Sequence, residues 1–232
     1  DLGYREVNLN LGCPSGTVTA KGKGAGFLRD PDGLDRFLEQ IFSRAKVAIS
    51  IKTRVGFSSP EEFERLQECF DRYPCAELIV HPRVRSDFYK GKVRLEAFAS
   101  AVERSTVSLC YNGDLTTSDE IGIFRQCFPA VDRVMLGRGL VGGPALASKA
   151  KGGPSSDRDT LRRFHDALYE GYAEAFGSRH NAMLRMKELW FYQIRQFADA
   201  EKLGKKIKKA QTLAEYEETA EQLIYEKHMV QA

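Results

Sequence analysis

Five short apolar runs alternate with segments of helical periodicity along the first part of the chain. The runs are Glu6–Leu11, Val47–Thr53, Glu77–His81, Val107–Tyr111 and Arg133–Leu136. Short apolar runs bounded by turn residues are typical of strands. The first run carries Val7, Leu9 and Leu11, so we expect the chain to open with a buried strand.

The segments between these runs have the spacing of amphipathic helices. The expected apolar faces are Leu34, Phe37, Leu38, Ile41 and Phe42; then Phe63, Leu66 and Phe70; then Ile121, Phe124 and Phe128. The second helix carries a start signal, with Ser59 as N-cap, Pro60 at the first helical position and Glu62 three residues after Ser59. Repeated strand–helix units predict right-handed crossovers and a parallel sheet.

Polar residues whose side chains can take part in binding or catalysis follow each of the five predicted strands. They are Cys13, Lys52, Arg54, His81, Arg83, Asn112, Asp114 and Arg138. An open doubly wound sheet concentrates its site at one switch point, whereas a (β/α)8 barrel spreads it over all strand ends. We therefore expect an α/β fold, a TIM-type (β/α) barrel with its five C-terminal strands present and the first three missing from this sequence. An open sheet is the alternative.

A change of composition at Ala150–Asp159 predicts a linker, and the pattern beyond it is entirely helical. The apolar positions expected there are Leu161, Phe164, Leu168, Tyr172, Met183, Met186, Trp190, Phe197, Leu213, Tyr216 and Leu223. We therefore predict a partial catalytic barrel at residues 1–150 and a small helical domain at residues 151–232.

Composition narrows the function classes only a little. The 232 residues are 42% hydrophobic with a net charge of +3, which is too small to indicate a polyanion partner by itself. No run is long enough to span a bilayer, and no secretory signal is present. The five cysteines lack metal-ligand spacing, so we expect reduced thiols, no metal site and a cytoplasmic protein.

Cys13 stands between Gly12 and Pro14 at the end of the first predicted strand. Both neighbours restrict the backbone, which favours a positioned thiol over a simple buried hydrophobe. No base is adjacent in the sequence, so we expect Cys13 to act as a proton donor. The nearby glycine-rich segment Gly22–Gly26 does not follow a strand, which excludes a dinucleotide fingerprint and favours a loop facing the substrate.

Two glycine-containing turns end the last two predicted strands and favour a phosphate site. One contains Asn112, Gly113 and Asp114, and the other contains Gly137 and Arg138. Backbone N–H groups of such turns bind anions, and in barrels the last two strand ends are the frequent phosphate site. Lys52 lies within an otherwise apolar strand, where an unpaired cation is unfavourable unless an anionic ligand lies nearby.

Two further segments are rich in basic and aromatic residues. The loop after the third strand contains Arg83, Arg85, Tyr89 and Lys90, which could hold a nucleotide by charge and stacking. Residues 178–210 carry an excess of lysine and arginine, including Lys205 and Lys206, which suits an RNA backbone. A solvated loop and a solvated helix face are the alternatives.

Five segments resemble, in order, the motifs of the tRNA-dihydrouridine synthase family. They are NLNLGCPSGTV, SIKTRVG, IVHPRVRSDFYKG, YNGD and VMLGRGLVGGP, and Pro82, Val84 and Asp87 depart from the family pattern. The resemblance implies an FMN-dependent TIM barrel with a C-terminal helical domain, which reduces the 5,6 double bond of uridine in tRNA with NADPH.

The resemblance also implies roles for individual residues. Cys13 would be the catalytic acid that protonates C5 of the uracil, and Asn10 would hold the base. Lys52 and His81 would lie around the flavin, with Arg83 on the nucleotide. The basic segment described above, with Lys205 and Lys206, is the part expected to bind the tRNA. The FMN phosphate and ribityl chain would be held by Asn112, Gly113, Asp114, Gly137 and Arg138. The alternatives are another FMN-barrel oxidoreductase acting on a small pyrimidine and a non-catalytic RNA-binding protein.

Overall fold

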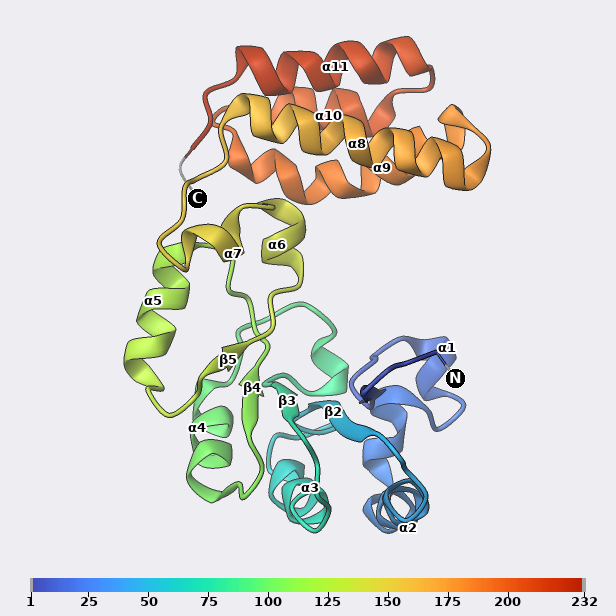
Figure 1. Cartoon of the computed structure of the whole chain (residues 1–232), viewed down its shortest axis with the longest axis vertical. Helices are drawn as coiled ribbons and strands as arrows, with labels where there is room; N and C mark the ends of the chain where they lie inside the picture. Colours follow the sequence, from blue (N-terminus) through green and yellow to red (C-terminus); the bar gives the residue numbers. More distant parts are fainter. Residues whose placement is uncertain (1, 231–232) are drawn as a thin grey trace. The chain divides into compact units, whose positions relative to one another are not determined.

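The computed structural model describes residues 2–230, which form two compact units (Figure 1). The first unit, called here the sheet unit, comprises the chain up to Gly113 together with Arg125–Met135. The second, the helical unit, comprises Asp114–Phe124 and the chain from Leu136 onward. The functional domains predicted at residues 1–150 and 151–232 stay a prediction, because these compact units follow a different division.

All five predicted strands are present in the sheet unit. They are β1 (Glu6–Asn10), β2 (Ala48–Arg54), β3 (Leu78–His81), β4 (Leu109–Tyr111) and β5 (Arg133–Val134). Every pair is parallel and the spatial order is the order of the sequence. A doubly wound sheet would reverse its order at a switch point. The expected α/β fold, with barrel-type winding and a helical part after it, is confirmed.

The prediction of a buried first strand is wrong for most of β1. The side chain of Val7 is 44% exposed and only Leu11, just after the strand, is buried. Within the described residues β1 pairs with β2 alone, so it is an edge strand with little packed against its faces. β3 and β4 are buried along their whole length, and β2 is buried at five of its seven residues.

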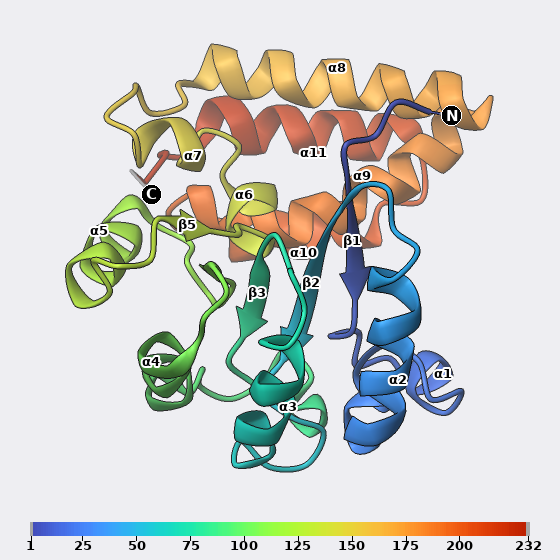
Figure 2. The ribbon, with the colours of Figure 1, turned by 60° about the horizontal axis from the view of Figure 1, so that its bottom comes forward.

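Helices connect these strands and line one face of the sheet, as Figures 1 and 2 show for α2, α3 and α4. The elements are α1 (Gly16–Thr19), η1 (Gly24–Arg29), α2 (Pro31–Phe42), α3 (Glu62–Phe70), η2 (Arg85–Asp87), α4 (Leu95–Arg104) and α5 (Ser118–Cys127). The Asp30 side chain caps α2 by accepting from Gly33 N at 2.9 Å, and Leu34 and Leu38 on its apolar face are buried as predicted.

The start of α3 differs from the predicted capping by Ser59. The helix begins at Glu62 with Glu61 as N-cap, and the Ser59 side chain makes no capping hydrogen bond. The Glu62 carboxylate instead accepts from three backbone N–H groups, those of Phe57, Ser58 and Ser59, at 2.7, 3.1 and 3.0 Å. Glu62 therefore satisfies donors that would otherwise be unpaired ahead of the helix.

The helical unit has its own apolar core. Its elements are α6 (Arg138–Gly142), α7 (Leu146–Lys149), α8 (Arg158–Phe176), α9 (Arg179–Gln193), η3 (Ile194–Gln196), α10 (Glu201–Lys209) and α11 (Leu213–Glu226). Most of the predicted apolar positions are buried there, including Leu161, Met183, Met186, Trp190, Phe197, Tyr216 and Leu223.

Phe164 is an exception in this core, with 38% of its surface exposed. The buried face of α8 passes instead through His165 and Tyr169, one residue later in each turn. Among residues 2–230 no helix is both long enough and apolar enough to span a membrane.

Candidate active site

The loop after β1 holds Cys13 in a backbone-defined position. Asn10 Oδ1 accepts from Gly12 N at 3.1 Å, and the Cys13 carbonyl accepts from Ala25 N at 3.0 Å. Gly24 has a φ of +53°, and a Cβ atom there would lie 2.9 Å from Cys13 Cβ. The glycine-rich segment therefore packs directly against the partly buried Cys13. Gly24, Ala25 and Gly26 are buried at the start of η1, and the expectation that this segment faces the substrate stays a prediction.

Lys52 lies beside Asn10 on the neighbouring strand, because the two residues are paired in the β1–β2 register. Paired positions on adjacent strands direct their side chains to the same face of a sheet. Within residues 2–230 the Lys52 ammonium group has no hydrogen-bond or ion-pair partner. Burial lowers the Lys52 pKa and Arg54 lowers it further, while the thiols of Cys110 and Cys13 act in the opposite direction. Among the residues that the structure describes, no carboxylate pairs with this ammonium group.

Arg54 connects the loops that follow β1 and β3. Its side chain is 1% exposed and donates from Nε to Gly12 O at 2.9 Å. It also donates to Val84 O at 2.9 Å and Phe88 O at 2.6 Å. A guanidinium group is a rigid fork of five donors, so it can fix several carbonyls at once. Arg54 therefore ties the Cys13 loop to the loop after His81.

His81 ends β3 and is buried against Arg83. Arg83 is 1% exposed, and its Nη1 lies 3.2 Å from His81 Nε2. A guanidinium only donates, so His81 Nε2 must accept and the imidazole is neutral with its proton on Nδ1. Arg83 also donates to Gly91 O. Arg83 is thus in contact with His81. The assignment of Arg83 to the nucleotide stays a prediction.

The rest of the basic loop is held by aromatic contacts. Arg85 donates to Thr19 Oγ1 at 3.2 Å and stacks on Phe88, with its Cζ 4.9 Å from the ring centroid. The exposed Tyr89 covers Arg54, whose Cζ lies 5.4 Å from the Tyr89 ring centroid. Asp87, one of the departures from the family pattern, pairs with Arg94, and this pairing lowers the Asp87 pKa.

Asn112 and Gly113 follow β4 in the sheet unit. Asn112 Nδ2 donates to Met135 O at 2.8 Å and so connects the ends of β4 and β5. At Gly113, a Cβ atom would lie 2.5 Å from Tyr111 Oη, so only glycine fits without a shift. The turn is therefore built tightly, and its predicted contact with the FMN phosphate and ribityl chain stays a prediction.

The other predicted phosphate residues belong to the helical unit. Asp114 has a φ of +28°, and its Oδ1 accepts from Arg138 Nη2 at 2.5 Å. Gly137 is the N-cap of the short helix α6, which Arg138 begins. The two glycine-containing motifs are thus joined through an ion pair between their charged members.

Lys205 and Lys206 lie on the exposed face of α10. Lys206 is 3.4 Å from Gln222 Oε1 and 3.6 Å from Glu218 Oε2. Lys205 lines a groove of about 870 Å³ together with Lys187, Arg195, Lys208 and the exposed Phe191. Basic groups around an aromatic ring suit a nucleic acid, and the role of both lysines in tRNA binding stays a prediction.

Sequence reasoning found the strand-end residues but missed the role of Arg54. The signal available was a charged residue at the end of an apolar strand, which is rarely buried unless its donors are satisfied. Its three acceptors come from two other loops, so the pairing could not be read from spacing. The sheet unit brings Asn10, Cys13, Lys52 and His81 to the C-terminal ends of three adjacent strands.

A model of the dihydrouridine synthase (Dus) family matches residues 1–231. A probable tRNA-dihydrouridine synthase of Staphylococcus epidermidis is 26% identical over 94% of this chain and 67% of its own length. A tRNA-dihydrouridine(16) synthase of Pseudomonas putida is 28% identical, over 86% of this chain and 64% of its own. A tRNA-dihydrouridine(16) synthase of Aquipseudomonas alcaligenes is 31% identical over 63% of this chain and 47% of its own length. The chain spans about two thirds or less of these relatives, and it belongs to the dihydrouridine synthase family.

Proposed function

We propose that this protein is a tRNA-dihydrouridine synthase. It is an oxidoreductase that reduces the 5,6 double bond of uridine in tRNA, with FMN as cofactor and NADPH as reductant. The observation that carries the proposal is the arrangement of Cys13, Lys52 and His81 at adjacent strand ends in a chain of this family. The predicted cytoplasmic location stays a prediction.

The residues present fit a flavin. Lys52 is a partly buried cation without a partner among residues 2–230, so it can stabilise negative charge on a reduced ring. Neutral His81 lies at the next strand end along the sheet. Asn112, Gly113, Asp114, Gly137 and Arg138 are the residues that would hold the ribityl chain and phosphate. Members of this family are generally flavin-dependent.

The reaction adds one hydride and one proton across the C5–C6 bond. FMN, when bound, supplies the hydride to C6 of the uracil. The Cys13 Sγ–H then donates its proton to C5, and the thiolate regains a proton from water. Asn10 Oδ1 accepts from Gly12 N, which leaves the Asn10 Nδ2 group able to donate to an acceptor such as a uracil carbonyl.

The uridine must leave its stack to reach a buried strand end, and unstacking is favoured when the protein binds the surrounding RNA. We assign this task to the basic face of α10, with Lys205 and Lys206, and to the loop that contains Arg83. An enzyme acting on a small pyrimidine has no need of such a face. Reversing the charge of Lys205, Lys206, Lys208 and Lys209 should therefore abolish salt-sensitive tRNA binding, and unchanged binding would favour the small-molecule enzyme.

The test of the proposed reaction is the dihydrouridine content of tRNA in cells whose only copy of this protein carries Cys13→Ala. We expect dihydrouridine at the sites this protein serves to fall to the level of a deletion strain. Cys127→Ala is the matched control, because Cys127 is an exposed cysteine outside the site and its loss should leave the content unchanged. Dihydrouridine at the level of the parent strain in Cys13→Ala would contradict the proposal.

A further inference from the structure

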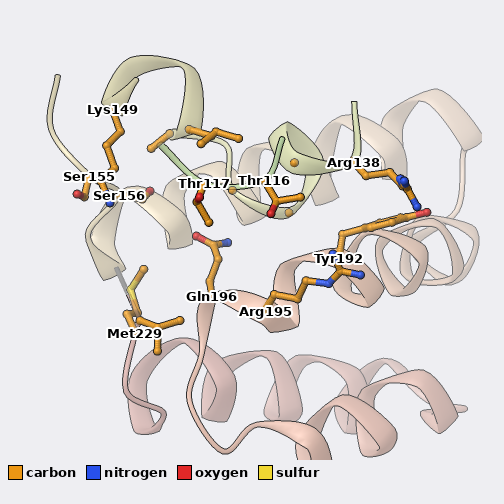
Figure 3. A pocket seen from close by; sticks show the side chains of 16 residues that line it. Thr116, Thr117, Arg138, Lys149, Ser155, Ser156, Tyr192, Arg195, Gln196 and Met229 are labelled. Atoms are coloured by element: carbon orange, nitrogen blue, oxygen red, sulfur yellow. The ribbon is translucent and has the colours of Figure 1, made fainter. Parts of the chain in front are cut away.

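The helical unit contains a pocket of about 160 Å³ whose lining shares only Arg138 with the strand-end residues described above. Figure 3 shows that its labelled residues come from several segments. They include Thr116 and Thr117 ahead of α5, Lys149 of α7, Ser155 and Ser156 ahead of α8, and Gln196 of η3. The pocket is thus built where distant parts of the chain meet within one compact unit.

Two features give this pocket a fixed wall. The segment after α11 pairs with the one after η3, since Ala198 N donates to His228 O and Val230 N donates to Gln196 O, both at 2.8 Å. On the opposite side α6 packs closely because of its glycines. A Cβ at Gly139 would lie 2.2 Å from Leu115 O, and one at Gly142 would lie 3.2 Å from Tyr192 O. Two sides of the cavity are therefore formed by segments that are hydrogen-bonded or closely packed.

The pocket contains a buried donor that nothing in the described chain satisfies. Gln196 is 6% exposed, and its Nε2 has no hydrogen-bond partner among residues 2–230. Figure 3 shows the Gln196 amide directed into the space toward Thr116 and Thr117. A buried polar group without a partner is unfavourable by about 1–3 kcal/mol, so such a group commonly marks a ligand.

The lining selects for negative charge. It includes the cations Arg138, Lys149 and Arg195 and several hydroxyl groups, and none of the described residues that line it is an aspartate or a glutamate. Arg138 is paired with Asp114 outside the lining, whereas Arg195 has no hydrogen-bond or ion-pair partner among residues 2–230. Amide, hydroxyl and guanidinium donors together match the acceptor oxygens of a phosphate group.

We propose that this pocket binds a phosphate group, with Gln196 and Arg195 as its principal donors. The volume suits a phosphate and the start of an attached sugar, and it is too small for a whole nucleotide, whose sites are commonly about 300 Å³ or larger. The phosphate has two possible sources, the 2′-phosphate of a pyridine dinucleotide and the backbone of an RNA. The proposal does not depend on the reaction proposed above.

The experiment is a calorimetric titration of the flavin-loaded protein with inorganic phosphate, so that any flavin phosphate site is already filled. Gln196→Leu removes the amide, and Gln193→Leu is its matched control. Gln193 is equally buried and also has an unpartnered amide atom, but it lies outside the pocket. Arg195→Gln removes the charge, with Arg36→Gln on α2 as a control of equal charge change outside the helical unit.

We expect phosphate affinity to fall about 10-fold in Gln196→Leu and in Arg195→Gln, and to stay at the parent value in both controls. Parent affinity in Arg195→Gln and Gln196→Leu, or no binding by the parent protein, would overturn the proposal. If Gln196→Leu does not fold, Arg195→Gln against Arg36→Gln decides alone.

Two further titrations assign the source of the phosphate. Tighter binding of NADP⁺ than of NAD⁺, lost in Arg195→Gln, assigns it to the dinucleotide. Weaker binding of a short oligoribonucleotide in Arg195→Gln, with NADP⁺ and NAD⁺ indistinguishable, assigns it to RNA. A protein that binds phosphate in this pocket and forms no dihydrouridine would contradict the proposed function and leave this inference intact.

Discussion

The two cationic side chains of β2, Lys52 and Arg54, differ in their hydrogen-bond partners. Arg54 donates to three backbone carbonyls, whereas Lys52 has no partner among residues 2–230. The guanidinium fork can satisfy three acceptors in fixed directions, and an ammonium group on a flexible stem cannot. Arg54 therefore fixes two loops of the protein, and the action of Lys52 on a bound group stays a prediction.

We expect Arg54→Lys to keep the charge and lose the connection between these loops. The unfolding free energy should fall by about 2–4 kcal/mol, because at least one buried carbonyl loses a charge-assisted bond. Cys13 should also react faster with a maleimide, since its loop is no longer held through Gly12. Peptide mass spectrometry separates Cys13 from the exposed Cys127, which serves as an internal control. A stability loss with unchanged Cys13 labelling would show that Arg54 has no positioning role.

The sequence was sufficient to identify which residues end the strands, because the apolar runs mark where each strand stops. It was not sufficient to show what those residues contact. Arg54 bonds to residues 42, 30 and 34 positions away, and Arg83 folds back under His81. Such pairings depend on how loops from separate strands meet, and periodicity carries no information on that.

At the scale of elements, the segment Gly22–Gly26 contains glycines for two different reasons. One position needs glycine because its φ angle is positive, and another also needs it because a Cβ atom there would collide with Cys13. Gly22 and Gly24 both have positive φ, +65° and +53°. A Cβ atom at Gly22 would meet nothing within 4 Å, whereas at Gly24 it would meet both Cys13 Cβ and Cys13 O at 2.9 Å. Substitutions at the two positions therefore separate backbone strain from displacement of Cys13.

We expect Gly22→Ala to lower the unfolding free energy by about 1 kcal/mol through backbone strain alone, with the Cys13 environment unchanged. Gly24→Ala should lower it further and reduce dihydrouridine formation, because Cys13 must shift. The measurements are denaturant unfolding of both variants and the single-turnover rate of dihydrouridine formation. Equal rates in the two variants would mean that contact with Gly24 does not position Cys13.

The elements themselves were predicted well where a periodic face is buried, as in α2 with Leu34 and Leu38. Prediction failed where burial depends on what lies beside an element. Val7 follows a strand pattern, yet β1 is an edge among the described residues and leaves it exposed. The predicted Ser59 cap at the start of α3 is wrong for a local reason. The Glu62 carboxylate accepts from three preceding backbone N–H groups, so a serine cap is unnecessary.

At the scale of the whole molecule, two compact units carry separate cores, and one buried chain of hydrogen bonds belongs to the helical unit alone. Trp190 Nε1 donates to Tyr216 Oη at 3.1 Å, and Tyr216 Oη lies 2.7 Å from His165 Nε2. His165 Nδ1 lies 2.9 Å from an Asp166 carboxylate oxygen. A neutral imidazole that donates from Nδ1 and accepts at Nε2 satisfies every member of this chain.

Burial lowers the pKa of His165 from its ordinary value of 6.5, with Asp166 acting in the opposite direction. The unfolded chain therefore binds a proton at a higher pH than the folded one does. The contribution of His165 to the unfolding free energy of the helical unit should be at its maximum above about pH 6.5. It should fall as the pH drops below that value, by at most about 1.4 kcal/mol per pH unit.

Trp190 is the only tryptophan of the chain, so its fluorescence reports unfolding of the helical core. Urea unfolding followed at about pH 7 and about pH 5 should show a lower unfolding free energy at the lower pH. His165→Gln should reduce this dependence of the unfolding free energy on pH. His180→Gln, at an exposed position on α9, should keep the slope of the parent. An unchanged slope in His165→Gln would assign the pH dependence to other groups.

The pairing of Ala198 and Gln196 with His228 and Val230 has a practical consequence for handling this protein. Val230 lines the Gln196 pocket and donates from its N–H to Gln196 O, so a dye or an affinity tag attached at Val230 begins close to the wall of that pocket. A polyhistidine tag would add titratable positive charge near a cavity that selects for anions. Ligand titrations are therefore best made with such additions cleaved off.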